Sequence, residues 1–250
     1  MFHIWNNIHH DRLMNCRAGP GKAYEPTDVE HLANMISHGI WIIPSLFGLL
    51  FMVFLSASDV QLTNAVIYGF ALLALFTVST TFHTISYHSK KYSSSVKDIF
   101  HIGDRVVIYI FIAASYTPWL TMKDLGSWGL YVVWIIWFLA AVGIAYQYTY
   151  HEQYKWLEIL FYLLIGICPA AVIFAMNDRS GVYELALGGV VYVSGVVFFK
   201  CDGIIPFAHA IWHCFVLVGA IFHYYAVCTY LLGTKELDQN LQSSGILKGL

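Results

Sequence analysis

The 250-residue chain is 58 % hydrophobic and only 11 % charged, with a mean hydropathy of +0.63, which is too apolar for a soluble globular protein of this length. A formal charge of −2, without a basic stripe interleaved with aromatic residues, argues against nucleic acid as a partner. The five cysteines are odd in number and form no C-x-x-C pair, which argues against a disulfide framework or a thiolate zinc site.

In chain order, an N-terminal arm (1–36) precedes seven apolar segments, each close to the roughly 20 residues that cross a bilayer. The predicted spans cover 37–56, 64–85, 99–120, 130–150, 156–176, 184–200 and 207–231, and a C-terminal tail (232–250) follows. The sequence therefore predicts an all-α integral membrane protein, a seven-transmembrane helix bundle that forms one domain (37–231). Because the number of spans is odd, we expect the two termini on opposite sides of the membrane.

Basic residues in the connections predict the orientation of the bundle. The arm and the second, fourth and sixth connections together hold eight Lys and Arg residues, whereas the remaining connections and the tail hold four. We therefore expect the N-terminus in the cytoplasm and the C-terminus in the lumen or outside the cell.

Ionisable side chains are costly inside a bilayer, so their positions are informative. Five polar side chains occur near the end of span two and near the starts of spans three and seven: His83, Asp104, Arg105, His209 and His213. Because successive spans cross the membrane in alternating directions, these three span ends lie on one side. We expect the five residues to converge at one depth, whichever way the protein is oriented.

The histidine spacing is typical of a metal site. His213 follows His209 by four positions, so on a helix both side chains leave the same face, about 6 Å apart. Ser79 and His83 repeat this spacing in span two. Three imidazoles with a carboxylate nearby suit a zinc ion that keeps one coordination position for water. The pattern predicts a zinc site of these three histidines, with Asp104 as a further ligand or as the group that holds the water.

Other residues on the same side leave alternatives open. His101, three residues before Asp104, is a competing ligand, and His38 and His88 lie at the same membrane face. Arg105 is expected either to extend toward the lipid headgroups or to pair with a carboxylate.

Four segments resemble a known family: "EHLANMISH", "STTFHTISYHS", "HIGDRVVIYIFIAASYTPWL" and "FFKCDGIIPFAHAIWH". They are similar to the progestin and adipoQ receptor family, which includes the bacterial hemolysin III type proteins, and in particular to its branch of monocyte to macrophage differentiation factors. The similarity extends from about residue 24 to residue 232.

The resemblance implies a seven-helix bundle with a cytoplasmic N-terminus and a zinc ion near the cytoplasmic face, held by His83, His209 and His213. It also implies that Asp104 contacts the metal or holds its water, and that Ser79 lies beside it. Some relatives are receptors for adiponectin or progestins, and others are linked to ceramide hydrolysis. The branch implies an intracellular membrane, Golgi or endolysosomal, rather than the plasma membrane. The expected partners are the bilayer itself and a membrane lipid, such as a sphingolipid, or a small lipid ligand.

Three functions are consistent with these residues. The first is a zinc-dependent hydrolase of a lipid amide or ester, with Asp104 as general base or water orienter and Ser79 as hydrogen-bond donor to the developing oxyanion. The second is a non-catalytic receptor or signalling scaffold in which the same residues hold a structural zinc ion. A transporter or pore ranks third, because coupled transport usually needs polar or broken helices near the midplane and spans four to six contain little that is polar.

Overall fold

The computed structural model describes residues 13–19, 21–88 and 91–233, and this part of the chain is helical with no strand. The elements are α2 (Asp28–Gly39), α3 (Ile42–Leu55), α4 (Asp59–Tyr87), α5 (Ser94–Met122), α6 (Ser127–Tyr150), α7 (Lys155–Ile167), the 3₁₀ helix η2 (Cys168–Ala175), α8 (Val182–Phe199) and α9 (Ala208–Tyr230). Together they form seven segments that are long and apolar enough to span a membrane, which confirms the predicted fold class. The first 12 residues of the predicted arm and all but two residues of the predicted tail lie outside the described residues.

The first span begins earlier than the apolar pattern indicates and is built from two helices. α2 starts after Thr27, whose side chain and that of Glu30 form a capping box, so helical structure begins nine residues before the predicted position 37. The helix is interrupted between Gly39 and Ile42, and α3 then continues to Leu55. Pro44 lies in the first turn of α3, where its missing N–H needs no helical partner, so the interruption falls where proline is tolerated.

The fifth span changes its helix type near its middle. α7 ends at Ile167 and continues as the 3₁₀ helix η2, with Pro169 in the first turn of η2. Proline cannot donate the backbone hydrogen bond that continues an α-helix, which explains the change at this point. The Tyr116 hydroxyl of α5 donates a hydrogen bond to the carbonyl of Gly166, so a backbone group near the break is satisfied by a neighbouring helix.

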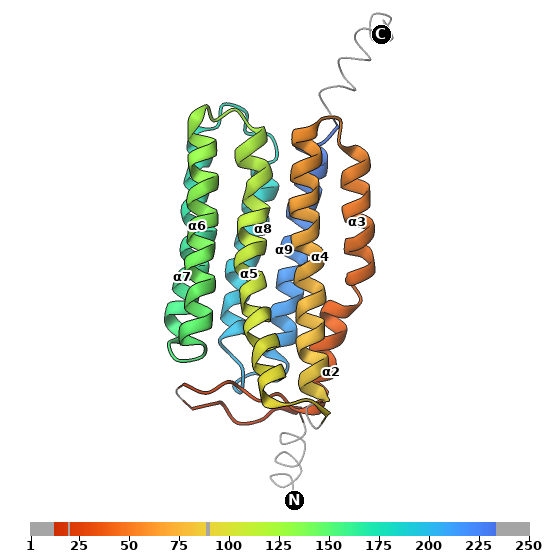
Figure 1. Ribbon diagram of the computed structural model, residues 1–250, viewed down its shortest axis with the longest axis vertical. Coiled ribbons are helices and arrows are strands. Elements are labelled where there is room, and N and C mark those ends of the chain that lie inside the picture. The colour runs from red at the N-terminus through yellow and green to blue at the C-terminus, as the bar shows by residue number, and fades with distance from the viewer. Residues whose placement is uncertain (1–12, 20, 89–90, 234–250) are drawn as a thin grey trace, which may run out of the picture.

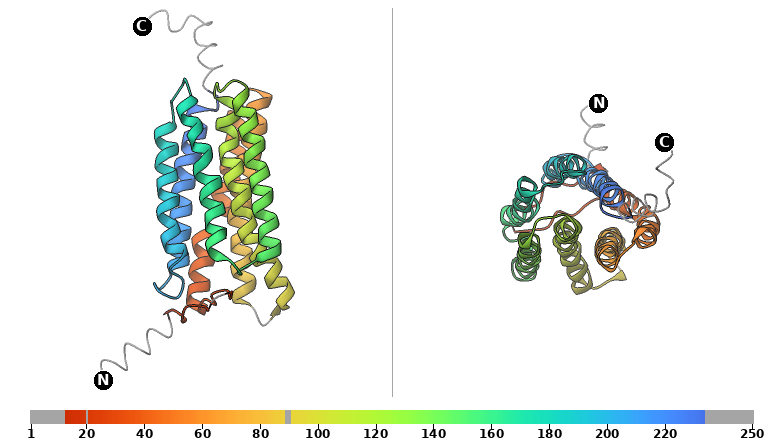
Figure 2. Two further views of the ribbon diagram at one scale, coloured as in Figure 1. Left: turned by 90° about the vertical axis from the view of Figure 1, so that its left-hand side faces the viewer. Right: turned by 90° about the horizontal axis from the view of Figure 1, so that it is seen from above.

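The helices run nearly parallel to the long axis of the molecule, and the view from above shows them arranged around its interior (Figures 1 and 2). The interior is filled by large side chains, among which Tyr68, Tyr109 and Trp119 are at most 1 % exposed. Large apolar side chains also cover the outside, as shown by Phe54, 82 % exposed, and Phe174, 84 % exposed. An apolar exterior around a packed interior is expected for a bundle surrounded by lipid.

One end of the bundle collects the polar side chains that the sequence analysis singled out. The connections from α4 to α5, from α6 to α7 and from α8 to α9 lie at the end where α2 begins, and we call this the site end (lower end in Figure 1). The described chain enters the bundle here and leaves α9 at the opposite end, as an odd number of spans requires. α2 packs against both α4 and α9, so it lies beside the histidine-bearing ends of these two helices.

Candidate metal centre

The structure brings together the three histidines that the sequence predicts as ligands. His83 comes from the last part of α4, and His209 and His213 come from the first two turns of α9. One ring nitrogen from each lies within 4.8 Å of the others. The ring centroid of His83 is 5.2 Å from those of both His209 and His213. This arrangement needs only small side-chain shifts to bring three nitrogens to about 2.1 Å from one zinc ion.

The burial of these rings fits a metal ligand set. His83 and His213 are each 2 % exposed, and neither ring nitrogen of His83 has a hydrogen-bond partner among the described residues. A buried polar group without a partner is unfavourable, and coordination of a metal ion would satisfy it. Together with the closeness of His209 and His213, the unpaired nitrogens of His83 fit a bound ion.

A serine that the sequence analysis did not single out orients His213. The Oγ of Ser37, in α2, lies 2.8 Å from Nδ1 of His213 and donates a hydrogen bond of 3.0 Å to the carbonyl of Asn34. Because the hydroxyl hydrogen points to Asn34, the hydroxyl oxygen is free to accept a hydrogen bond from a protonated Nδ1. This leaves the lone pair of Nε2 available to a metal, an arrangement found around most metal-binding histidines.

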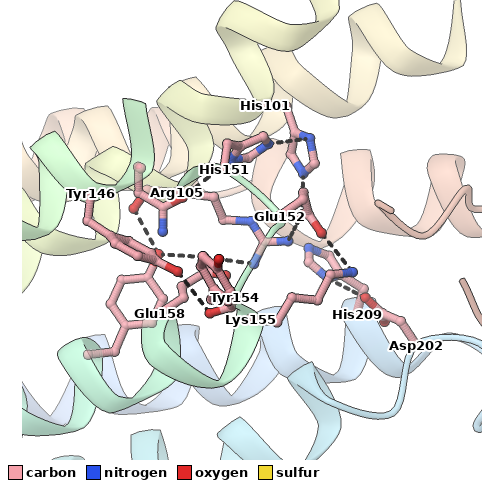
Figure 3. Close-up of polar contacts among 12 residues, drawn as sticks. His101, Arg105, Tyr146, His151, Glu152, Tyr154, Lys155, Glu158, Asp202 and His209 are labelled. Carbon is pink, nitrogen blue, oxygen red and sulfur yellow. Dashed lines mark hydrogen bonds and ion pairs between the residues drawn. The ribbon is translucent and has the colours of Figure 1, made fainter. Parts of the chain in front are cut away.

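A carboxylate that the sequence analysis missed has the same relation to His209. The Oδ2 atom of Asp202, in the connection between α8 and α9, lies 3.4 Å from Nδ1 of His209 (Figure 3). Both α9 histidines therefore engage Nδ1 with an oxygen and leave Nε2 for coordination. The only local signal for Asp202 was its position in the "FFKCDGIIPFAHAIWH" segment, seven residues before His209.

Asp104 and Ser79 lie beside the histidines. Both are buried, and both line a cavity whose wall also includes His209 and His213. The Asp104 carboxylate is not in the group of ligand atoms that lie within 4.8 Å of one another. The Oγ of Ser79 has no hydrogen-bond partner among the described residues. Both side chains therefore face the space next to the ligand set with polar atoms available to a bound molecule.

His38 is closer to the site than its sequence position suggested. Its ring stacks on that of His213 with centroids 3.6 Å apart and an angle of 12° between the ring planes. It is 3 % exposed and lines the same cavity as Asp104 and Ser79. Since α2 packs against both α4 and α9, it contributes His38 and Ser37 to the surroundings of the ligand set.

The cavity extends from the histidines into the apolar interior. It has a volume of about 490 Å³, and most of its wall is apolar, with side chains such as Phe111, Leu163, Val190 and Val216 from α5, α7, α8 and α9. A second hollow of about 540 Å³ lies at the site end and has a more polar wall that includes Arg17, Arg105 and Lys200. His209 and Phe199 line both spaces, so the predicted metal site lies where an apolar chamber meets a polar opening.

Arg105 pairs with carboxylates, which is one of its two predicted roles. Its guanidinium lies 3.6 Å from Glu158 and 3.7 Å from Glu152, and it also covers the ring of Phe199 at 4.5 Å. His101, the predicted competing ligand, belongs to this second polar group and contacts His151 and Glu152 (Figure 3).

Comparison with known proteins shows the family of this chain. The sequence profile described as haemolysin-III related matches residues 29–224, a region that includes every residue of the metal centre described above. The chain is 49 % identical over 220 residues to the monocyte to macrophage differentiation factor of Homo sapiens, which is 88 % of this chain and 92 % of that protein. It is 34 % identical over 215 residues to the hemolysin-3 homolog of Bacillus subtilis (strain 168), or 84 % of this chain and 98 % of that protein. These similarities confirm the resemblance indicated by the motifs.

Proposed function

Because the chain belongs to the haemolysin-III related family, also called the progestin and adipoQ receptor family, we propose that it is a zinc-dependent hydrolase of a membrane lipid amide of the ceramide type. The observation that carries this proposal is the junction of the three-histidine cluster with an apolar cavity of about 490 Å³. That volume is in the range of sites that enclose small organic ligands. A lipid chain in the cavity would place a polar linkage next to the histidines.

The ligand set of the proposed site is His83, His209 and His213. A zinc ion bound there would supply Lewis acidity, which polarises a carbonyl and makes water a better nucleophile. Ser37 and Asp202 contact Nδ1 of the two α9 rings, so Nε2 of each ring would be the nitrogen left to hold the ion.

Asp104 and Ser79 have separate proposed roles. Asp104 orients the attacking water and accepts its proton. This role fits its position, because its carboxylate lines the cavity but is not one of the ligand atoms that lie within 4.8 Å of one another. The Ser79 hydroxyl donates a hydrogen bond to the oxygen of the scissile carbonyl as negative charge develops on it. The position of Ser79 in the wall of the cavity, together with Asp104, His209 and His213, supports this role.

We place the site end at the cytoplasmic face. This orientation is supported by the excess of Lys and Arg in the connections at that end, including Lys91, Lys155 and Lys200. We further propose an intracellular membrane, Golgi or endolysosomal, as the location. In this arrangement the hollow next to His209 opens toward the cytoplasm and gives water access to the reacting linkage.

A receptor or scaffold with a structural zinc ion is the second candidate. The ligand set joins α4 to α9, and the contact of Ser37 with His213 adds α2, so a bound ion would tie three helices together. In that case metal would control the stability of the bundle, and no lipid would be turned over.

The test uses the full chain purified in detergent, with zinc content and ceramide hydrolysis measured on the same samples. The wild type is compared with the double variant His209→Ala, His213→Ala, with Asp104→Asn, and with His88→Ala as a histidine control outside the cluster. A hydrolase predicts zinc and turnover in the wild type, loss of turnover and of the zinc ion at the three histidines in the double variant, and loss of turnover alone in Asp104→Asn. Zinc without turnover in the wild type would favour the receptor or scaffold, and a zinc content unchanged in the double variant would contradict both.

A further inference from the structure

A second cluster of metal-ligating side chains lies at the site end, apart from the three-histidine set. His101 is at the start of the third turn of α5, His151 is the C-cap residue of α6, and Glu152 is in the turn before α7. One ligand atom from each lies within 4.8 Å of the others. His101 Nδ1 is 2.9 Å from His151 Nε2, and His101 Nε2 is 3.4 Å from a carboxylate oxygen of Glu152 (Figure 3).

The surroundings hold these side chains in position. The Oε1 atom of Gln147 lies 3.3 Å from His151 Nδ1, so a proton on Nδ1 is directed to Gln147 and the lone pair of Nε2 points to His101. The His101 ring stacks on Phe82, with centroids 4.8 Å apart and ring planes 3° from parallel. Glu152 has a left-handed backbone conformation (φ 62°), which is unfavourable for a residue other than glycine and is often associated with functional sites.

Two basic side chains lie near the Glu152 carboxylate. Lys155 Nζ lies 2.7 Å from Glu152, and Arg105 lies 3.7 Å from it. These two cations favour the ionised form of the carboxylate. The carboxylate is therefore ionised at neutral pH, as a metal ligand must be.

An entering cation would compete with Lys155 rather than with a buried charge. The Lys155 side chain is 37 % exposed, and its Nζ also donates a hydrogen bond of 2.7 Å to the carbonyl of Lys22. It can therefore leave Glu152 and still have a partner. Arg105 keeps its pairing with Glu158 at 3.6 Å. Replacement of Lys155 by a metal ion leaves no charged side chain of this group without a partner.

We propose that His101, His151 and Glu152 form a second metal site that binds a divalent first-row transition ion of the zinc class. Two imidazole nitrogens and one carboxylate suit such an ion, whereas Ca²⁺ and Mg²⁺ prefer an all-oxygen set. The site lies in the wall of the polar hollow that also reaches His209, so a bound ion would join α5 to the turn between α6 and α7 at the mouth of that hollow. This inference does not depend on hydrolase activity.

The experiment counts metal ions on the full chain in detergent, stripped with chelator and then titrated with Zn²⁺ or with Co²⁺, whose visible spectrum reports nitrogen and oxygen ligands. The wild type should bind two ions per chain in the presence of excess Mg²⁺ and Ca²⁺. His151→Ala and Glu152→Gln should each bind one, and so should the double variant His209→Ala, His213→Ala. The control His88→Ala should bind two. If the three-histidine site binds no metal, the wild type still binds one ion at the second site. The failure of one proposal can therefore be told apart from the failure of the other.

Lys155→Gln provides a test that does not depend on damaging the site. Removal of the competing ammonium should raise the Zn²⁺ affinity of the second site several-fold, whereas a salt bridge with a purely structural role predicts no gain. The proposal would be overturned if the wild type and Glu152→Gln bound the same number of ions per chain. It would also be overturned if Lys155→Gln bound Zn²⁺ with the same or a lower affinity than the wild type.

Discussion

Ser37 Oγ lies 2.8 Å from Nδ1 of His213, although the two residues are separated by 176 positions in the chain. The contact connects α2, which precedes the break in the first span, with the second turn of the last span. The contact favours the tautomer of His213 that carries its proton on Nδ1 and leaves Nε2 for a metal ion.

Ser37→Ala is expected to weaken Zn²⁺ binding at the three-histidine site by about 10- to 100-fold, because the loss of an outer partner of a ligating histidine typically has this effect. The binding constant can be measured by competition with a chelator of known affinity. Ser37→Thr, which keeps a hydroxyl, should restore most of the affinity.

Ser45→Ala is the matched control for Ser37. Ser45 is also a buried serine of the first span, but its hydroxyl donates only to the carbonyl of Ile42. Its replacement should leave the Zn²⁺ affinity unchanged. Equal affinities for Ser37→Ala and Ser45→Ala would remove Ser37 from the role assigned to it.

The packing of α8 against α9 depends on a close approach at Gly195. A Cβ atom added there would lie 2.6 Å from Cβ of Phe215 and 2.8 Å from the ring of Trp212. Gly195→Ala should therefore lower stability by about 1–3 kcal/mol through overpacking. The shift of the thermal unfolding midpoint in detergent measures this effect.

Gly189 lies on the same helix as Gly195 and provides the comparison. A Cβ added at Gly189 meets nothing within 4 Å in the described structure, and alanine favours a helix more than glycine does. Gly189→Ala should leave the unfolding midpoint unchanged or raise it. A drop as large as that of Gly195→Ala would mean that the contact between α8 and α9 is not the cause.

The end opposite the site is held by an ion pair whose strength should depend on pH. Lys123, at the end of α5, lies 2.5 Å from Asp178 in the connection before α8 and 2.7 Å from Ser180. The hydrogen bond from Lys123 holds the pKa of Asp178 below its usual range. Because the folded pKa is lowered, this stabilisation is present above about pH 4 and is lost as the pH falls through the folded pKa.

Asp178→Asn should thus lower the thermal midpoint at pH 7 by an amount that corresponds to no more than about 1 kcal/mol, because the carboxylate is exposed to solvent. The difference from the wild type should shrink as the pH is lowered below about 4. Arg179→Gln, next to Asp178 in the chain, controls for a general effect of charge in this connection. A difference that grows toward low pH would have the wrong sign for this ion pair.

If the cavity holds the lipid chain of the substrate, its depth should select chain length. Ser115 is buried in α5, lines the cavity, and bonds only to the carbonyl of Ile112. Ser115→Phe would fill part of this space and should reduce hydrolysis of both a long-chain and a short-chain ceramide. The factor of reduction should be at least about tenfold larger for the long-chain substrate. Zinc content should stay at the wild-type level. Equal losses for both chain lengths would show that the chain does not occupy this part of the cavity.

The sequence by itself determined the class of fold and indicated the three histidines that lie together. Apolar segments of membrane-spanning length give the helices, and a separation of four residues places His209 and His213 on one helix face through local geometry alone. The alternation of spans then brings His83 and Asp104 to the same end. The start of the first span was not predicted, because the capping box at Thr27 lies outside the apolar pattern.

Only the tertiary structure decided which side chains surround those ligands. The contacts of Ser37 with His213 and of His101 with His151 depend on which helices are neighbours and how they are rotated, and no local period encodes either property. The same holds for the 490 Å³ cavity, whose walls come from several helices. Local spacing placed pairs of residues on one helix face, whereas packing between helices decided which faces meet.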